Sequence, residues 1–98
     1  MDINVEKNGT ELNVALTGRL DTTTAPELEG KLNEILDGVT GLTFDMSNLE
    51  YISSAGLRVL LSSQKRMKEQ GKMVVTNVNE AIMEIFDVTG FSDILTIE

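Results

Sequence analysis

The sequence predicts an α/β protein in which helices pack on a mixed, largely parallel sheet. Segments with alternating apolar residues are separated by segments with apolar residues at helical spacing, in the order strand, strand, helix, strand, helix, strand, helix. The later connections are long enough to hold a helix, as parallel neighbours require. The 98 residues, 41% hydrophobic and 24% charged, suit one globular domain, which we expect to span residues 1–98.

The first two strands are predicted to form a β-hairpin. Ile3 and Val5 alternate with polar residues, as do Leu12, Val14 and Leu16. Residues 7–10 between them read Lys-Asn-Gly-Thr, and an Asn-Gly pair is typical of a tight hairpin turn.

A first helix is predicted to begin at Thr24. Thr24 and Glu27 have the spacing of a capping box, and Pro26 between them suits a first helical turn. The apolar residues that follow recur at helical spacing: Leu28, Leu32, Ile35 and Leu36. We expect the helix to end near Asp37 and Gly38.

Leu42, Phe44 and Met46 alternate with polar residues and predict a third strand, which we place centrally because a long helical connection precedes it. A second helix is expected to begin at Ser53 or Ser54, to end near Gln70 and to be closed by Gly71. Its expected inward side chains are Leu57, Leu60, Leu61 and Met67.

The last third of the chain predicts one more strand and one more helix. Residues 73–77 form a β-branched run typical of a buried parallel strand, and either Asn77 or Asn79 can cap the helix that follows. Residues 91–97 fit either an edge strand or a final helical turn.

Four polar residues are expected at one edge of the sheet. Asp21 follows the second strand, and Asp45, Ser53 and Ser54 come at or just after the end of the third. Sites in open α/β sheets form at the carboxyl ends of strands. The two aspartates could hold a divalent cation, but we favour turn-forming or helix-capping roles for them. A serine at a helix start can be a cap or a phosphate acceptor.

Composition excludes several classes of function. The chain has no histidine and no cysteine, which removes the usual general base, the commonest transition-metal ligand and all thiol chemistry. A net charge of -8 disfavours nucleic acid as a partner. The N-terminal residues lack the features of a signal peptide and no apolar run could span a membrane, so we expect a cytoplasmic protein.

The segment 52–56, Ile-Ser-Ser-Ala-Gly, has part of the pattern of a serine nucleophile elbow. Ile52 stands where that pattern requires glycine, and no histidine can accept the serine proton. No phosphate-binding glycine loop is present either. We therefore predict a protein that is not an enzyme and that needs neither a cofactor nor a metal. The basic residues of the second helix either form a solvated face or bind a partner: Arg58, Lys65, Arg66 and Lys68.

Three segments taken together resemble the STAS domain of bacterial anti-sigma factor antagonists. They are Leu-Thr-Gly-Arg-Leu-Asp at 16–21, Phe-Asp-Met-Ser at 44–47 and Tyr-Ile-Ser-Ser-Ala-Gly-Leu at 51–57. The resemblance covers essentially the whole chain, and its most specific part is the Ser-Ala-Gly-Leu turn. It implies a mixed four- to five-stranded sheet with helices packed chiefly on one side.

The resemblance also implies a function by binding. Such antagonists capture an anti-sigma factor that is itself a serine kinase, which frees a sigma factor for transcription. Phosphorylation by the kinase ends the binding, and a serine phosphatase restores it. The phosphoacceptor implied here is Ser54, with Ser53 as a lesser candidate that stands where switch members of the family usually have aspartate. The implied partner-binding residues are Asp21, Asp45, Ser53, Ser54, Ala55, Gly56 and Arg58.

A second hypothesis keeps the same fold but removes the switch. Domains of this type also occur as scaffolds in signalling assemblies, and the substitution of serine at position 53 is compatible with that role. A switch predicts phosphate transfer onto the chain and a loss of affinity, whereas a scaffold predicts stable assembly that modification does not change.

Overall fold

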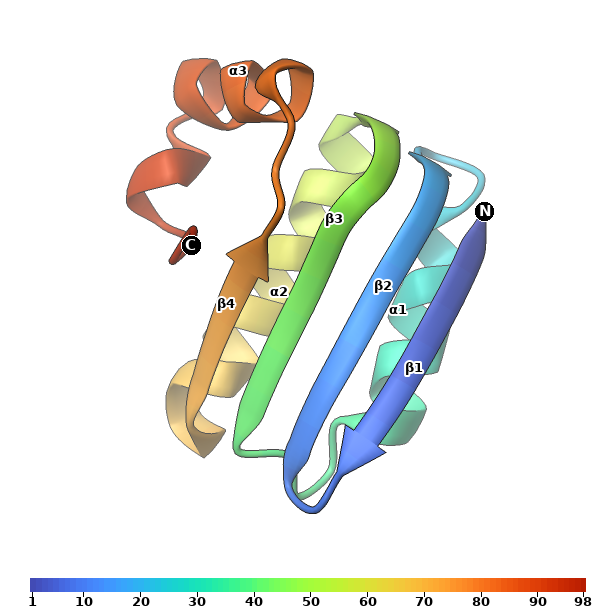
Figure 1. Cartoon of the computed structure of the whole chain (residues 1–98), viewed down its shortest axis with the longest axis vertical. Helices are drawn as coiled ribbons and strands as arrows, with labels where there is room; N and C mark the ends of the chain where they lie inside the picture. The colour runs from blue at the N-terminus through green and yellow to red at the C-terminus, as the bar shows by residue number, and fades with distance from the viewer.

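Four strands in the spatial order β1-β2-β3-β4 form one sheet in the computed structural model, which describes all of residues 1–98 (Figure 1). β1 (Asp2–Asn8) pairs antiparallel with β2 (Glu11–Leu20). β3 (Gly41–Ile52) lies parallel to both β2 and β4 (Lys72–Thr76). The predicted mixed, largely parallel sheet is therefore confirmed, with four strands.

The predicted hairpin is also present. Asn8 pairs with Glu11, which leaves Gly9 and Thr10 as a two-residue loop. Gly9 has a φ of 65°, a left-handed conformation that glycine adopts without steric cost.

Two long helices cover one face of the sheet. α1 (Ala25–Ile35) and α2 (Ser54–Gln70) both lie behind the strands in Figure 1. α3 (Glu80–Thr89) lies beyond the ends of β3 and β4, and the short 3-10 helix η1 (Phe91–Asp93) follows it. The expectation of helices chiefly on one side is confirmed. None of the helices combines the length and the apolar character needed to cross a membrane.

Alternation along the strands determines which side chains meet the helices. In β2 the residues Leu12, Val14 and Leu16 are buried, while their neighbours stay half-buried or exposed on the uncovered face of the sheet. Together with the inward residues of the helices they join one cluster of 23 buried hydrophobic residues. The open face, by contrast, carries mainly polar and small side chains from these strands.

β3 is longer than the sequence predicts. Alternating burial ends at Met46, after which the buried residues are Leu49 and Ile52, three apart. The pairing of β2 with β3 shifts register twice, between Ala15 and Thr17 and again between Gly18 and Arg19. Each shift inserts one extra residue in β3 and interrupts the period of two by which a strand is recognised. The strand therefore continues to Ile52 instead of ending near Met46.

The structure shows which asparagine caps α3 and which conformation residues 91–97 adopt, two points that the sequence leaves open. Asn79 caps α3, because its side chain accepts a 2.9 Å hydrogen bond from the Ile82 amide. After η1 the chain returns to the sheet through one isolated bridge between Ile97 and Val75. The last segment is thus a helical turn followed by a single strand-like contact.

Candidate functional site at the start of α2

The parallel register of β2 and β3 brings two strand-to-helix turns together. Leu20 and Ile52 are paired at the ends of these strands, so the turn that begins at Asp21 and the turn at Ser53 are neighbours. The Ser53 amide donates a 2.9 Å hydrogen bond to the Leu20 carbonyl and ties the two turns. Asp21, Ser53 and Ser54 are therefore brought together as expected.

Ser53 and Ser54 have different environments although they are adjacent. Ser53 is the N-cap residue of α2 in extended conformation, but its side chain makes no capping hydrogen bond. Its Oγ is buried and has no hydrogen-bond partner. Ser54 is the first residue of the helix and its side chain is exposed. Of the two hydroxyls, only that of Ser54 is open to a macromolecular partner.

Gly56 sets how closely α2 approaches the strands. A Cβ atom at this position would lie 2.7 Å from Cγ of Leu20, 2.8 Å from Cγ1 of Ile52 and 3.0 Å from the Leu20 carbonyl oxygen. Only glycine allows this approach, and Ala55 beside it is half-buried. The Ser-Ala-Gly sequence thus presses the helix start against the ends of β2 and β3 and leaves Ser54 at the surface.

The turn before α1 corrects one prediction. Thr24 precedes α1, but it has helical backbone angles and its side chain makes no capping bond, so the predicted capping box is wrong. Its hydroxyl accepts from the Asp21 amide and donates to the Arg19 carbonyl, each at 2.8 Å. The end of β2 competes for this hydroxyl, a contact that local sequence spacing does not reveal. Pro26 does occupy the first turn, as predicted.

Asp21 closes this turn with its carboxylate. Its Oδ1 accepts hydrogen bonds from the Thr23 hydroxyl at 2.8 Å, the Thr23 amide at 3.0 Å and the Thr24 amide at 3.2 Å. These donors, led by the Thr23 hydroxyl, hold the pKa of Asp21 below its usual range. The expected turn-forming role is confirmed.

Asp45 does not lie with the other predicted residues. It is in the interior of β3, opposite Thr76 at the end of β4, and seven residues before the end of its own strand. At about 3.3 Å per residue that separation is roughly 20 Å, too far for Asp21 and Asp45 to share a cation. Hydrogen bonds from the Asn77 side chain at 3.1 Å and the Ser47 amide at 3.0 Å lower its pKa. The expected position at the end of the strand is wrong because β3 continues past it.

Sequence reasoning missed two side chains at this edge, Arg19 and Tyr51. They are paired across β2 and β3, and the Arg19 guanidinium lies 4.4 Å from the centre of the Tyr51 ring. Tyr51 keeps 37% of its surface exposed. The residues that follow them, Leu20 and Ile52, are buried. A polar or aromatic residue directly before a buried apolar residue, at 19–20 and at 51–52, was the sequence signal that could have indicated exposed side chains here.

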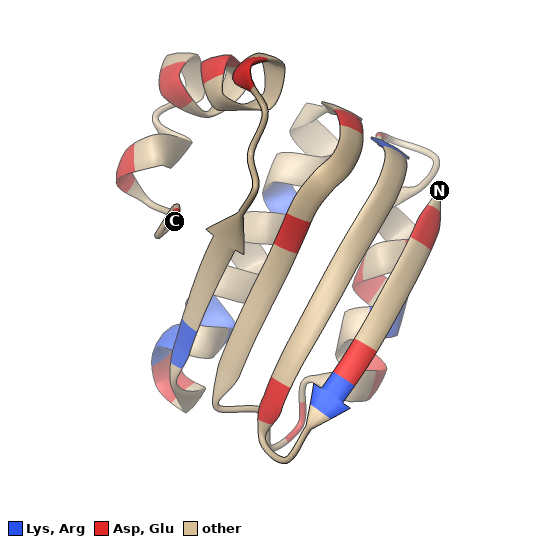
Figure 2. Cartoon of the chain, viewed as in Figure 1, with Lys and Arg blue, Asp and Glu red and all other residues tan.

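Next to Ser54 the surface is hollowed. A shallow groove of about 310 Å³ runs between α2 and the end of α3 with the segment that follows it. Its lining consists of Ser54, Leu57, Arg58, Leu61, Thr89 and Phe91. Arg58 is exposed, whereas α3 on the far side carries acidic and no basic side chains (Figure 2). The groove therefore combines apolar side chains, the guanidinium of Arg58, which forms no salt bridge, and the hydroxyl of Ser54.

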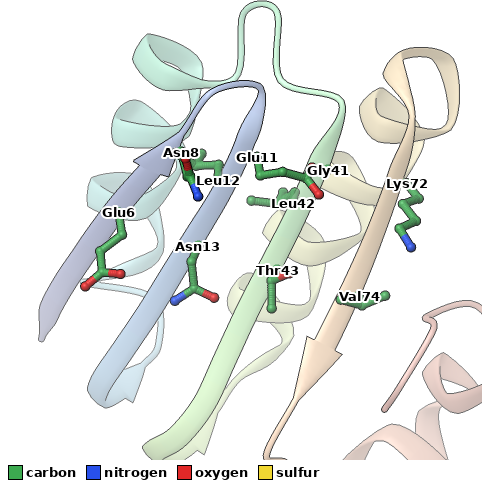
Figure 3. A pocket seen from close by; sticks show the side chains of 10 residues that line it. All are labelled: Glu6, Asn8, Glu11, Leu12, Asn13, Gly41, Leu42, Thr43, Lys72 and Val74. Carbon is green, nitrogen blue, oxygen red and sulfur yellow. The ribbon is translucent and has the colours of Figure 1, made fainter.

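Another hollow lies on the uncovered face of the sheet and is separate from these residues. It measures about 260 Å³ and is lined near the hairpin by Glu6, Glu11, Asn13, Thr43 and Lys72, among others (Figure 3). These residues come from the hairpin end of the sheet, whereas Ser54 follows the opposite end of β3. The structure contains no group of three or more acidic, histidine or cysteine side chains placed to hold a metal.

Comparison with known proteins agrees with this arrangement. The family model for the STAS domain matches residues 2–98. The anti-sigma-B factor antagonist of Bacillus subtilis is 30% identical over 98 residues, which cover 99% of this chain and 90% of that protein. The anti-sigma factor antagonist SpoIIAA has the same fold in its unphosphorylated form, with a TM-score of 0.85 at 16% identity, covering 99% of this chain and 88% of that one. The phosphorylated form of the Bacillus cell fate determinant SpoIIAA matches with a TM-score of 0.77 at 16% identity, covering 99% and 91%.

Proposed function

The chain belongs to the STAS domain family of anti-sigma factor antagonists, and from this membership we propose that it binds an anti-sigma factor that is a serine kinase and is released when that kinase phosphorylates Ser54. Binding withdraws the anti-sigma factor from its sigma factor and so permits transcription. A serine phosphatase would reset the cycle.

The observation that carries this proposal is the exposure of Ser54 on an uncapped helix start. No side chain accepts from the amides of the first turn of α2, and no acidic residue lies in that turn. A phosphate on Ser54 would therefore meet free N–H groups and the positive end of the helix dipole. The acceptor is accessible to a kinase, while Ser53 beside it is half-buried with its Oγ enclosed.

Phosphorylation would change binding without changing the fold. It adds about 1.5 to 2 negative charges at neutral pH in the middle of the surface formed by Ser54, Arg58 and the groove. Arg58, four residues along the same helix, is within the spacing at which side chains pair, so the phosphate would compete with the partner for this cation. Loss of the partner's contact with Arg58 and burial of the added charge against the partner would together cost about 3 kcal/mol or more, a hundredfold or greater loss of affinity.

The proposed role is that of substrate and ligand, not of catalyst. The chain has no phosphate-binding glycine loop, so we propose that its partner binds the ATP and transfers the phosphate. We expect the purified protein alone to hydrolyse neither ATP nor esters above background. Turnover that disappears in Ser54→Ala would contradict this.

The test is incubation with a purified anti-sigma factor serine kinase and ATP, followed by mass spectrometry. Wild-type protein should gain one phosphate on Ser54. Ser54→Ala should bind the kinase and gain none, and Ser54→Asp should bind at least tenfold more weakly, a difference of about 1.4 kcal/mol. Ser53→Ala is the matched control and should accept phosphate as the wild type does.

The scaffold role is the second candidate because of Ser53, which stands where switch members of the family usually have aspartate. Phosphate on Ser53, Ser62 or Ser63 with Ser54 unmodified would refute the assignment of the acceptor. No phosphate on any residue, together with equal affinity of Ser54→Asp and wild type, would favour the scaffold.

A further inference from the structure

The two edge strands of the sheet, β1 and β4, differ in whether their outer backbone groups have hydrogen-bond partners. Along β4, the returning C-terminal segment supplies a partner: the Val75 amide donates to the Thr96 carbonyl and the Glu98 amide donates to the Val75 carbonyl, each at 2.9 Å. β1 at the opposite edge has no strand on its outer side (Figure 1). The chain itself covers the β4 edge at Val75 and leaves the β1 edge uncovered along its whole length.

The open edge is regular enough to accept another strand. β1 pairs with β2 in unbroken register from Asp2 to Asn8, without a bulge and without proline. Alternate N–H and C=O groups of such a strand point away from its partner and are free to pair with an added strand. Of the devices that usually prevent this, β1 lacks bulges and prolines and has only one, the charged side chains of Asp2, Glu6 and Lys7.

A groove runs beside this edge, between the start of β1 and α1. It measures about 520 Å³, and its apolar and small lining includes Ile3, Pro26 and Gly30. A Cβ atom built on Gly30 meets nothing within 4 Å, so the helix surface is open there. In an added strand, every second side chain would point toward α1 and into this groove.

The charge around the groove is mainly negative. Asp2, Glu27 and Glu34 contribute three carboxylates, against the positive charges of Lys31 and the Met1 amine. A second copy of this chain would bring the same carboxylates and a net charge of -8 against them. Charge complementarity therefore favours a basic occupant over self-association.

We propose that the outer edge of β1 binds an extended, lysine- or arginine-rich segment of a partner protein as a fifth strand of the sheet. Its basic side chains on the α1 side enter the groove, with their aliphatic stems beside Gly30 and their charges near Asp2, Glu27 and Glu34. The residues involved are separate from Ser54 and its groove, so this surface is available in either phosphorylation state, and its test is independent of the proposed switch.

The probe is a fluorescein-labelled nine-residue peptide that alternates lysine and valine, titrated into the full chain at physiological salt and followed by fluorescence anisotropy. Glu27→Lys/Glu34→Lys should weaken binding at least fivefold. Gly30→Leu, which fills the groove from an exposed helical position, should also weaken it at least fivefold, while Gly30→Ala should change it less than twofold. A peptide with glutamate in place of lysine should not bind.

The matched control is Glu29→Lys/Glu69→Lys, which makes the same change in net charge at exposed helical positions outside the groove. It should bind within twofold of wild type. Amide hydrogen exchange adds a direct readout, because strand addition slows exchange at alternate residues of β1. The proposal is overturned if the control weakens binding as much as the groove variant, if exchange in β1 is unchanged by the bound peptide, or if the added peptide instead yields dimers of the chain through β1.

Discussion

The turns that lead into α1 and α2 follow neighbouring parallel strands, yet they use their side chains in opposite ways. In residues 21–24 the Asp21 carboxylate accepts from the backbone and the Thr24 hydroxyl bonds the end of β2. At residues 53–56 no side chain caps the helix, and the Oγ of Ser53 is buried without a partner. In the first turn the Asp21 carboxylate accepts hydrogen bonds from backbone amides. In the second turn the amides at the start of α2 have no side-chain acceptor.

This difference separates a structural turn from a turn available for function. A buried hydroxyl without a hydrogen-bond partner costs about 1–3 kcal/mol, so Ser53 makes the α2 turn less stable than an apolar residue at that position would. Functional sites often retain such costs. The comparison thus supports Ser53–Gly56 as the functional turn and Asp21–Thr24 as its neighbouring support.

The largest expected effect is at Gly56. Gly56→Val forces a side chain against Leu20 and Ile52 and should destabilise the protein by about 3 kcal/mol or more, the upper range for overpacking. Gly30→Ala is the control and should raise stability by about 0.5–1 kcal/mol, because alanine is the better helix former and space is open. Thermal melts measure both. An equal fall in midpoint for the two variants would show that the close approach at Gly56 is not special.

The second effect compares the two hydroxyls directly. Thr24→Ala removes a hydroxyl with two 2.8 Å hydrogen bonds and should cost about 1–2 kcal/mol. Ser53→Ala removes a hydroxyl that has no partner and should cost less than about 0.5 kcal/mol or stabilise. Urea denaturation gives both values. A similar loss for Ser53→Ala would mean that this hydroxyl is bonded in solution and that the turns are alike.

The third effect is electrostatic and smaller. α1 has Glu27 in its first turn, but α2 has no acidic residue there. Ser54→Asp should therefore stabilise the isolated protein by about 0.3–1 kcal/mol at low ionic strength. Ser54→Asn controls for the change of shape and should lack the gain. High salt should reduce the gain, since exposed charges are screened; a gain that salt leaves unaltered would have another cause.

The smallest effect is the pH dependence from Asp21. Hydrogen bonds hold its pKa below the unfolded value of about 3.9, so its contribution to stability is present above that value and is lost as pH falls through the folded pKa. Asp21→Asn should flatten the stability curve below about pH 4. Asp93→Asn, at an exposed aspartate of η1, should leave the curve closer to wild type. If the two variants have the same dependence of stability on pH, Asp21 does not contribute to the loss of stability in acid.

Most elements could be predicted because their signals are local. The Asn8-Gly9 turn, the apolar spacing of α1 and α2, and the Ser-Ala-Gly-Leu start of α2 lie in short segments of the chain. Errors arose where a strand competes with, or interrupts, the local pattern. Thr24 bonds the end of β2 instead of capping α1, and the bulged pairing with β2 hides the second half of β3.

By itself the sequence determined the order of strands and helices, the absence of histidine and cysteine, and the position of the two serines at a helix start, since each depends on residue identity or on spacing within a few residues. Only the tertiary structure decided that Asp45 lies apart from Ser54, that Ser53 is enclosed while Ser54 is exposed, and that Arg19 stacks on Tyr51. It also decided that the outer edge of β1 stays uncovered while β4 is bridged at Val75. These features depend on register and packing between segments about 30 residues apart, where free energy comes from burial and pairing over the whole core instead of from local preference.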